Sequence, residues 1–146
     1  MILITLILLC AVSGTRANPE IERDINWDSP ETRELFQNAC GDCHSYETKW
    51  PWYSRIAPIS WMIIRNVNEG REEFNVSASA LGEADEAAEE VLEDEMPPWE
   101  YVLLHPEAKL TAAQKDVLVT GLLNTFGGER KENKHDEDNE HDDHSE

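Results

Sequence analysis

Two cysteines and a histidine share one five-residue motif, C-G-D-C-H at residues 40–44. Two thiols three residues apart can add to the two vinyl groups of a haem, and the adjacent imidazole can bind the iron from one face. A chain that uses Cys40, Cys43 and His44 in this way has to fold around a large planar group. The motif therefore predicts one covalently attached haem c in each chain.

Two other kinds of site also use paired cysteines. A thioredoxin-like redox pair sits at the start of a helix in a βαβ unit, and no strand pattern precedes Cys40. A zinc site needs a second Cys or His pair at ligand spacing. The remaining thiol, Cys10, lies within the N-terminal apolar run. Both alternatives are therefore weaker than haem attachment.

The N-terminus has the pattern of an export signal. Residues 1–12 are apolar apart from Thr5 and carry no charge, and Thr15 and Ala17 supply the small residues that signal peptidase prefers. This indicates a signal peptide over residues 1–17 and a protein in the periplasm or on the outer face of the cytoplasmic membrane. No Lys or Arg precedes the apolar run, so an uncleaved anchor with weak membrane association through the N-terminus is the alternative.

The rest of the chain is strongly acidic. All 31 Asp and Glu follow residue 17, and no Lys or Arg interrupts the eleven acids between Glu72 and Glu100. Nucleic acids and anionic membranes are disfavoured as partners because both require positive protein surface. The composition favours a redox partner with a basic docking surface, although each acidic residue can equally serve solubility alone.

The last eighteen residues, 129–146, contain no apolar side chain and hold nine acids with three histidines. Such a segment cannot bury enough surface to offset its ordering entropy, so the sequence predicts a disordered acidic tail. The histidines could bind a divalent metal loosely, but a solvated tail is the simpler interpretation.

Residues 19–128 carry helix signals, and no alternating strand of useful length is present. An N-cap near Asp28-Ser29-Pro30-Glu31 starts a helix that runs into Cys40, with Leu35, Phe36 and Ala39 on one face. Three further helices are predicted, over residues 60–69 with Gly70 as the stop, over residues 79–93, and from Thr111 to Gly127 with a T-x-x-Q capping box. The fold class is all-α, a small helical domain with irregular segments between the first and second helices and between the third and fourth.

A haem iron held by His44 needs a second axial ligand or an open position. The candidates before the tail are Met62, Met96 and His105. Met96 precedes two prolines, which favour an extended segment from which a thioether can project. Met62 falls inside a predicted helix and is expected in the core. We therefore expect Met96 as the metal ligand, with His105 as the alternative.

This order of elements resembles a class I cytochrome c. Several motifs also resemble the bacterial haem-binding domain family over roughly residues 35–125: C-G-D-C-H-S, T-K-W-P-W-Y-S at 48–54, M-P-P at 96–98 and H-P at 105–106. The resemblance implies an exported, cytochrome c-like domain with covalent haem. It settles neither a reaction nor a partner.

The expected function is a monohaem c-type cytochrome that transfers single electrons, and not an enzyme. Trp50, Trp52, Tyr53 and Arg55 are expected to bind around the haem, with their polar ends near the propionates; aromatic core and a surface Arg are the alternative. A haem-based sensor with a displaceable sixth ligand is the alternative function. A peroxidase is less well supported, because the sequence has no His–Arg pair at helical spacing.

Overall fold

The computed structural model describes residues 16–128. The predicted acidic tail lies outside the described residues, as does the predicted signal segment apart from Arg16 and Ala17. Within residues 16–128, no helix combines the length and the apolar character needed to cross a bilayer.

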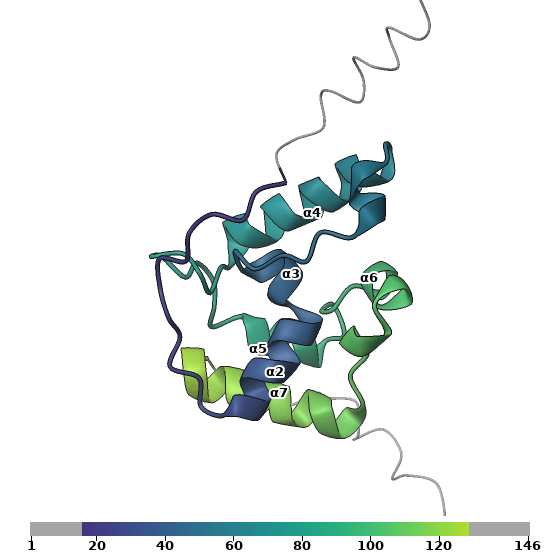
Figure 1. Cartoon of the computed structure of the whole chain (residues 1–146). Coiled ribbons are helices and arrows are strands. Elements are labelled where there is room, and N and C mark those ends of the chain that lie inside the picture. Colours follow the sequence, from purple (N-terminus) through teal and green to yellow (C-terminus); the bar gives the residue numbers. More distant parts are fainter. Residues whose placement is uncertain (1–15, 129–146) are drawn as a thin grey trace, which may run out of the picture.

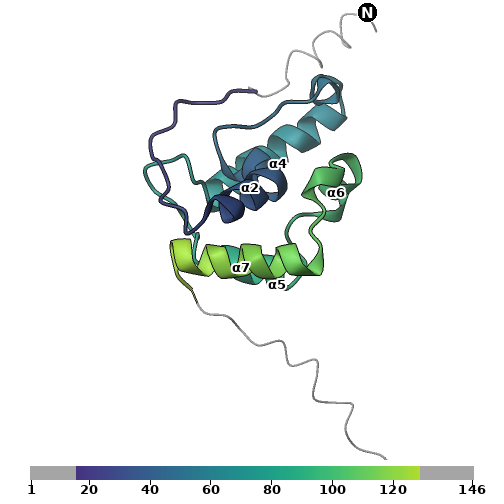
Figure 2. The same cartoon turned by 60° about the horizontal axis from the view of Figure 1, so that its bottom comes forward.

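The described chain is helical, which confirms the predicted all-α class. In chain order the elements are α2 (Pro30–Ala39), α3 (Gly41–His44), the 3-10 turn η1 (Trp52–Arg55), α4 (Ile59–Glu73), α5 (Ala87–Leu92), α6 (Trp99–Leu104), the 3-10 turn η2 (Pro106–Ala108) and α7 (Ala112–Phe126). α5 packs along α7 on one side, α4 lies on the other, and α2 and α3 run between them (Figures 1 and 2). Among these residues the only strand-like pairing is an isolated bridge between Phe74 and Gly82.

The first and last helices begin where the sequence predicts. Ser29 caps α2 by accepting a hydrogen bond from the Thr32 amide at 3.1 Å. The third position of the helix, which a capping box fills with Glu or Gln, is therefore occupied by Thr32 and not by Glu31. Thr111 and Gln114 form the full predicted capping box of α7. Both caps are local interactions, which is why the sequence alone identifies them.

The predicted end of the second helix is wrong. α4 continues through Gly70 to Glu73, and Gly70 is buried against α3. A Cβ atom at position 70 would lie 3.0 Å from both the Cβ and the carbonyl oxygen of Cys43. This glycine is therefore a close-packing residue between two helices and not a C-terminal stop.

The predicted third helix is mostly wrong in extent, since only residues 87–92 are helical. The residues before it fold back on the chain that follows α4. The Glu83 amide donates to the Glu73 carbonyl at 2.9 Å, and Gly82 has a positive φ of 75°. The apolar residues of this segment nevertheless face the core, since Ala84, Ala88 and Val91 are all buried.

The segment between the third and fourth helices is not wholly irregular as predicted, because it contains α6. This helix starts directly after Pro98 and has no buried residue. A six-residue helix gains little stability from helix propensity alone. α6 therefore depends on contacts between its side chains and other parts of the fold.

A chain of aromatic rings leads from the edge of the core to the C-G-D-C-H motif. Trp27 packs between Phe36 and Phe126, with ring centroids 4.9 and 5.6 Å away, and Phe74 lies 5.4 Å from Phe126. Phe74 in turn lies 5.3 Å from the imidazole of His44. The position of His44 thus depends directly on the packing of the core.

One glycine sets how closely α2 and α7 approach. A Cβ atom at Gly121 would lie 2.7 Å from the Cβ atom of Thr32, which is itself buried. We expect Gly121→Val to lower the free energy of unfolding by about 1–3 kcal/mol through overpacking, measured by urea denaturation. Ala113→Val on the exposed side of α7 is the control, and Thr32→Ala should partly restore the Gly121→Val protein. Equal stability of the two valine variants would contradict this account.

Candidate functional site

A largely apolar cavity of about 340 Å³ lies between α3, α4 and α6. This volume is in the usual range for small-molecule and cofactor sites. Seven of the candidate ligands and haem-contacting residues named from the sequence lie in its wall: Cys40, Cys43, His44, Tyr53, Met62, Met96 and His105. Residues that are 65 positions apart in the sequence are therefore brought to one site.

The two cysteines are free thiols at the junction of α2 and α3. The Cys40 carbonyl accepts the amides of Cys43 and His44 at 3.1 and 2.9 Å, which forms one helical turn. Since Gly70 packs against Cys43, α4 forms the wall opposite this turn. Both sulfur-bearing residues consequently line the same cavity.

His44 is buried and held in one orientation. Its Nδ1 donates to the Phe74 carbonyl at 3.0 Å, and its own carbonyl accepts from the Val76 amide at 3.0 Å. Because a carbonyl can only accept, the proton lies on Nδ1 and the lone pair on Nε2, which is the form that binds a metal. Burial lowers the pKa of His44, opposed by the hydrogen bond to Phe74 and the charge of Glu73, so the neutral imidazole is favoured.

The environment of the thiols does not suit dithiol redox chemistry. Burial, followed by the neighbouring Cys43, raises the pKa of Cys40 to about 12. Burial, followed by the charge of Asp42, raises the pKa of Cys43 to about 11, opposed by Arg71. Catalytic C-x-x-C thiols instead have lowered pKa values. Across residues 16–128, no three His, Cys, Asp or Glu side chains gather in a way that could hold a metal ion such as zinc.

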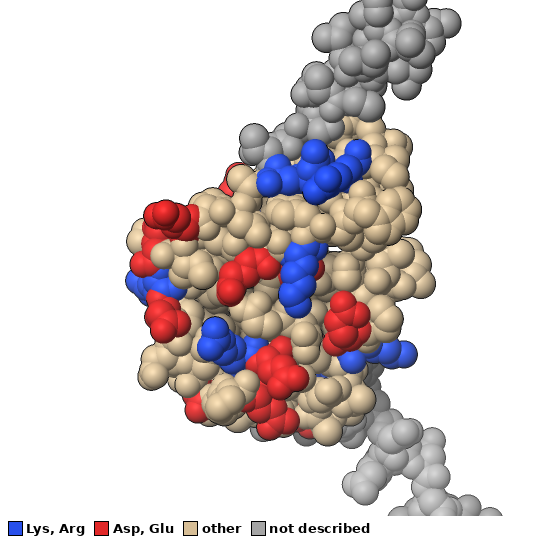
Figure 3. All heavy atoms as spheres, viewed as in Figure 1, with Lys and Arg blue, Asp and Glu red and all other residues tan. Residues whose placement is uncertain are grey.

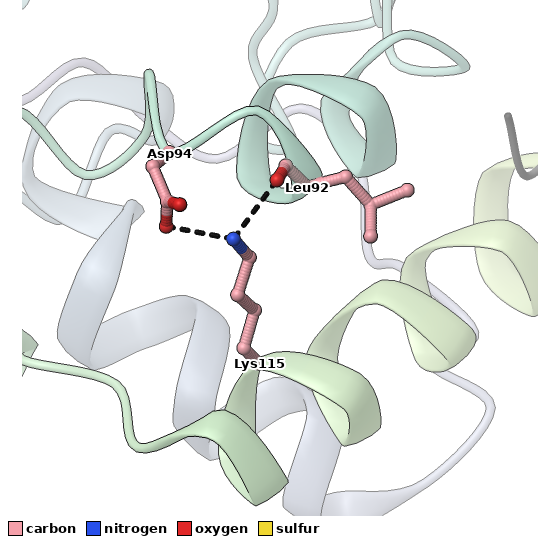
Figure 4. Close-up of polar contacts among 3 residues, drawn as sticks. All are labelled: Leu92, Asp94 and Lys115. Carbon is pink, nitrogen blue, oxygen red and sulfur yellow. Dashed lines mark hydrogen bonds and ion pairs between the residues drawn. The ribbon is translucent and has the colours of Figure 1, made fainter. Parts of the chain in front are cut away.

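Met96 reaches the cavity from the segment between α5 and α6. Its amide donates to the Glu90 carbonyl at 3.1 Å, and its side chain packs partly buried against the core. Lys115 of α7 holds the preceding turn, since its Nζ donates to the Leu92 carbonyl at 2.9 Å and pairs with Asp94 at 2.7 Å (Figure 4). The end of α5 is thereby tied to α7 just before Met96.

His105 has partners at both ring nitrogens. Its Nδ1 donates to the Tyr101 carbonyl at 3.0 Å, so its Nε2 accepts from the Tyr53 hydroxyl at 3.2 Å. The His105 ring also stacks on Tyr101 with centroids 4.0 Å apart. To bind a metal, His105 would have to give up one of these hydrogen bonds.

Tyr101 joins α6 to the C-G-D-C-H turn. Its hydroxyl donates to Asp42 Oδ2 at 2.8 Å, while Asp42 Oδ1 accepts the Lys49 amide at 2.7 Å. Burial and then the Asp42 charge raise the pKa of Tyr101, so the hydroxyl remains a donor. This contact gives the otherwise unburied α6 a fixed position over the cavity.

Three of the predicted haem-binding residues lie away from the cavity wall. Trp52 is 75% exposed and Arg55 is exposed. Trp50 lines a second, more polar cavity next to the first and donates its indole N–H to Asn18 Oδ1 at 3.2 Å. Met62, expected in the core, is instead 51% exposed and lines the cavity.

Sequence reasoning missed several residues of the site. Phe74 orients His44, and Tyr101 and Asp42 hold α6. The first turns of α4 supply apolar wall residues, among them Ile59 and Ile63. Ile59 and Ile63 are spaced i, i+4 and so share one helix face, which was the one signal available. The contacts of Phe74 and Tyr101 span 30 and 59 residues, beyond any local pattern.

The residues present fit a haem. The cavity wall is mainly apolar and contains two neighbouring thiols and an imidazole with a fixed tautomer. A model of the haem-binding domain family matches residues 2–124, most of the chain and the whole cavity. Comparisons with curated proteins and with solved structures find no match. The chain therefore belongs to the haem-binding domain family, and its cofactor is haem.

Proposed function

We infer that the protein is an exported monohaem c-type cytochrome that transfers single electrons. The observation that best supports it is the position of Met96 in the same cavity wall as Cys40, Cys43 and His44. One imidazole and one thioether are an established axial pair in cytochromes c. The partners already engaged at both His105 nitrogens favour Met96 over His105 as the second ligand.

When bound, the haem supplies an iron centre that gains or loses one electron. Cys40 and Cys43 would hold the haem covalently: each thiol would add its S–H across one vinyl group, which forms a C–S bond without an oxidant. The hydrogen bond from His44 to Phe74 keeps the imidazole oriented and raises its basicity as a ligand. The apolar wall excludes water from the iron ligands, which limits reorganisation when the charge changes.

A haem-based sensor with a displaceable sixth ligand is the second candidate. It is favoured by α6, which has no buried residue: Tyr101 of α6 bonds to the α3 turn, and His105 at its C-terminal cap bonds to η1. A segment held this way can open at low cost. The two candidates differ in whether a small ligand can reach the iron.

Carbon monoxide added to the reduced full-length protein separates these functions. An electron carrier with two strong axial ligands should keep its reduced absorption spectrum unchanged under carbon monoxide. Rapid and complete formation of a carbon monoxide spectrum would contradict the electron carrier and favour the sensor. The same spectra show whether haem is bound and whether it is attached covalently.

The acidic surface predicts a salt-dependent reaction with a redox partner that has a basic docking surface. Glu69, Glu73 and Glu100 all contribute to the cavity wall, so negative charge lies near the expected haem edge. Charge–charge steering is screened beyond about 8–10 Å at ordinary ionic strength. We expect the association rate with a basic acceptor to fall by about tenfold as salt is raised.

Stopped-flow electron transfer at a series of salt concentrations measures this. Glu73→Gln/Glu100→Gln should weaken the salt dependence, whereas Glu20→Gln/Glu31→Gln, which removes the same charge from exposed positions outside the cavity wall, should affect it less. A rate that is independent of salt would mean that the acids serve solubility alone.

A further inference from the structure

The acidic residues are not spread evenly over the fold. Residues 48–68, here called the acid-free segment, contain no Asp or Glu but hold Lys49, Arg55 and Arg65. This segment forms η1 and most of α4. Figure 3 shows one group of blue side chains on the α4 side of the molecule, while most of the red ones lie below it together with the other blue ones. A protein with a formal net charge of −19 therefore has a segment that carries bases and no acid, although Arg65 pairs with Glu69 just beyond it at 2.7 Å.

The acid-free segment also exposes large apolar side chains. Trp52 is 75% exposed and Ile56 47%. At the start of α4, Trp61 is 40% exposed, and Ile59 and Met62, 42% and 51% exposed, also line the cavity. An exposed cluster of large apolar residues on a soluble domain marks a surface for interaction. Tryptophan and aliphatic residues mixed with Lys and Arg are the composition of surfaces that lie in a membrane interface.

The N-terminal residues enter the fold at this same end. Arg16 donates to the Ser54 carbonyl of η1 at 3.0 Å, and Arg71 of α4 donates to the Ala17 carbonyl at 2.9 Å. Asn18 donates to the Thr48 carbonyl at 2.9 Å. Residues 16–18 are thus bound along the acid-free segment.

The apolar run of residues 1–12 is therefore attached close to this surface. Four residue steps separate residue 12 from Arg16, which span at most about 14 Å when fully extended. The family match begins at residue 2, so it includes this run together with the haem domain. A bilayer that takes up the run would come within reach of Trp52 and Ile56.

We propose that the acid-free segment is a membrane-docking surface, which lies on a phospholipid bilayer into which the N-terminal apolar run inserts. The net charge argues against anionic lipids, but the acids are absent from residues 48–68 and the bases there match anionic headgroups. Ile59 and Met62 belong both to this surface and to the cavity wall. The docked domain consequently holds one edge of its haem cavity next to the membrane surface.

Lipid photolabelling of the full-length, haem-loaded protein tests the proposal. The protein is reconstituted in nanodiscs of phosphatidylethanolamine and phosphatidylglycerol that contain a phospholipid with a photoactivatable group near the headgroup. Labelled peptides are then mapped by mass spectrometry. We expect labels on Trp52, Ile56 and Trp61, none of which lines the haem cavity. Trp99 and Leu103 of α6 are 72% and 73% exposed and serve as the internal comparison, which should stay unlabelled.

Two matched variants make the test specific. Trp52→Ser/Ile56→Ser should lower labelling of the acid-free segment at least about fivefold, whereas Trp99→Ser/Leu103→Ser should leave it unchanged. All four side chains are exposed, so the haem spectrum should be the same in both variants. Replacing phosphatidylglycerol by phosphatidylcholine should also reduce labelling, because the attraction to Lys and Arg is lost.

Labels confined to the N-terminal run, or spread equally over α6, would overturn the proposal. So would a detergent-solubilised dimer that Trp52→Ser/Ile56→Ser dissociates while lipid labelling is unaffected, since the surface would then bind a second copy of the chain. Neither result depends on the electron-transfer function, which the carbon monoxide experiment tests separately.

Discussion

Cys40→Ala/Cys43→Ala should produce a protein without covalently attached haem. Each thioether requires one thiol, and the two thiols are the only free cysteines among the described residues. Haem staining after denaturing electrophoresis, together with the mass of the intact protein, measures the loss. We expect the stain to disappear completely in the double variant, and to be strongly reduced in each single variant.

Asp42→Asn is the matched control because it lies between the two cysteines and leaves both thiols in place. It should retain the haem stain, although it weakens the contact between Asp42 and Tyr101. His44→Ala tests a different step, since it keeps the thiols and removes the proximal imidazole. We expect poor maturation and low stability from it. Undiminished haem stain in the double cysteine variant would refute covalent attachment.

Met96→Ala should open the second axial position of the iron. The thioether is removed, and the two other candidate ligands in the wall are poorly suited to replace it: His105 would have to give up a hydrogen bond to Tyr53 or Tyr101, and Met62 lies on α4 at 51% exposure. We expect the reduced protein to bind carbon monoxide, and any near-infrared sulfur-to-iron band of the oxidised protein to vanish. Absorption spectra with and without carbon monoxide measure both effects.

Met62→Ala is the matched control, because Met62 is a second methionine in the cavity wall and sits on α4. It should leave the ligand spectra unchanged. If Met96→Ala resembles the unmodified protein while His105→Ala changes the spectrum, the iron is held by two histidines. If Met62→Ala alone opens the position, the thioether comes from α4 and the assignment of Met96 is wrong.

The sequence predicted those parts of the fold that depend on near neighbours. The N-cap of α2 and the capping box of α7 each join residues three positions apart. The buried positions Leu35, Phe36 and Ala39 follow the helical period and need no partner to be recognised. These features depend on residues close together in the sequence, so they can be predicted from the sequence without the tertiary structure.

The errors occurred where distant segments compete for the backbone. Gly70 looks like a helix stop, but close packing against Cys43 keeps it inside α4. Residues 79–86 have a helical apolar pattern, but their backbone groups bond to the end of α4 and the chain after it, as Glu83 does with Glu73 and Leu81 with Asn75. Local propensity is weak, and tertiary hydrogen bonds readily override it.

By itself, the sequence determined which side chains are candidates to hold the haem, because thiols, imidazole and thioether are defined by residue type and spacing: it named Cys40, Cys43, His44 and Met96, with His105 as the alternative to Met96. Only the tertiary structure decided how they are held. It gave His44 a carbonyl partner at Phe74, engaged both nitrogens of His105, and placed Trp52 and Arg55 on the surface. The physical reason is that orientation, burial and hydrogen-bond competition depend largely on contacts between distant residues, such as His44 with Phe74 and His105 with Tyr53, which no local pattern encodes.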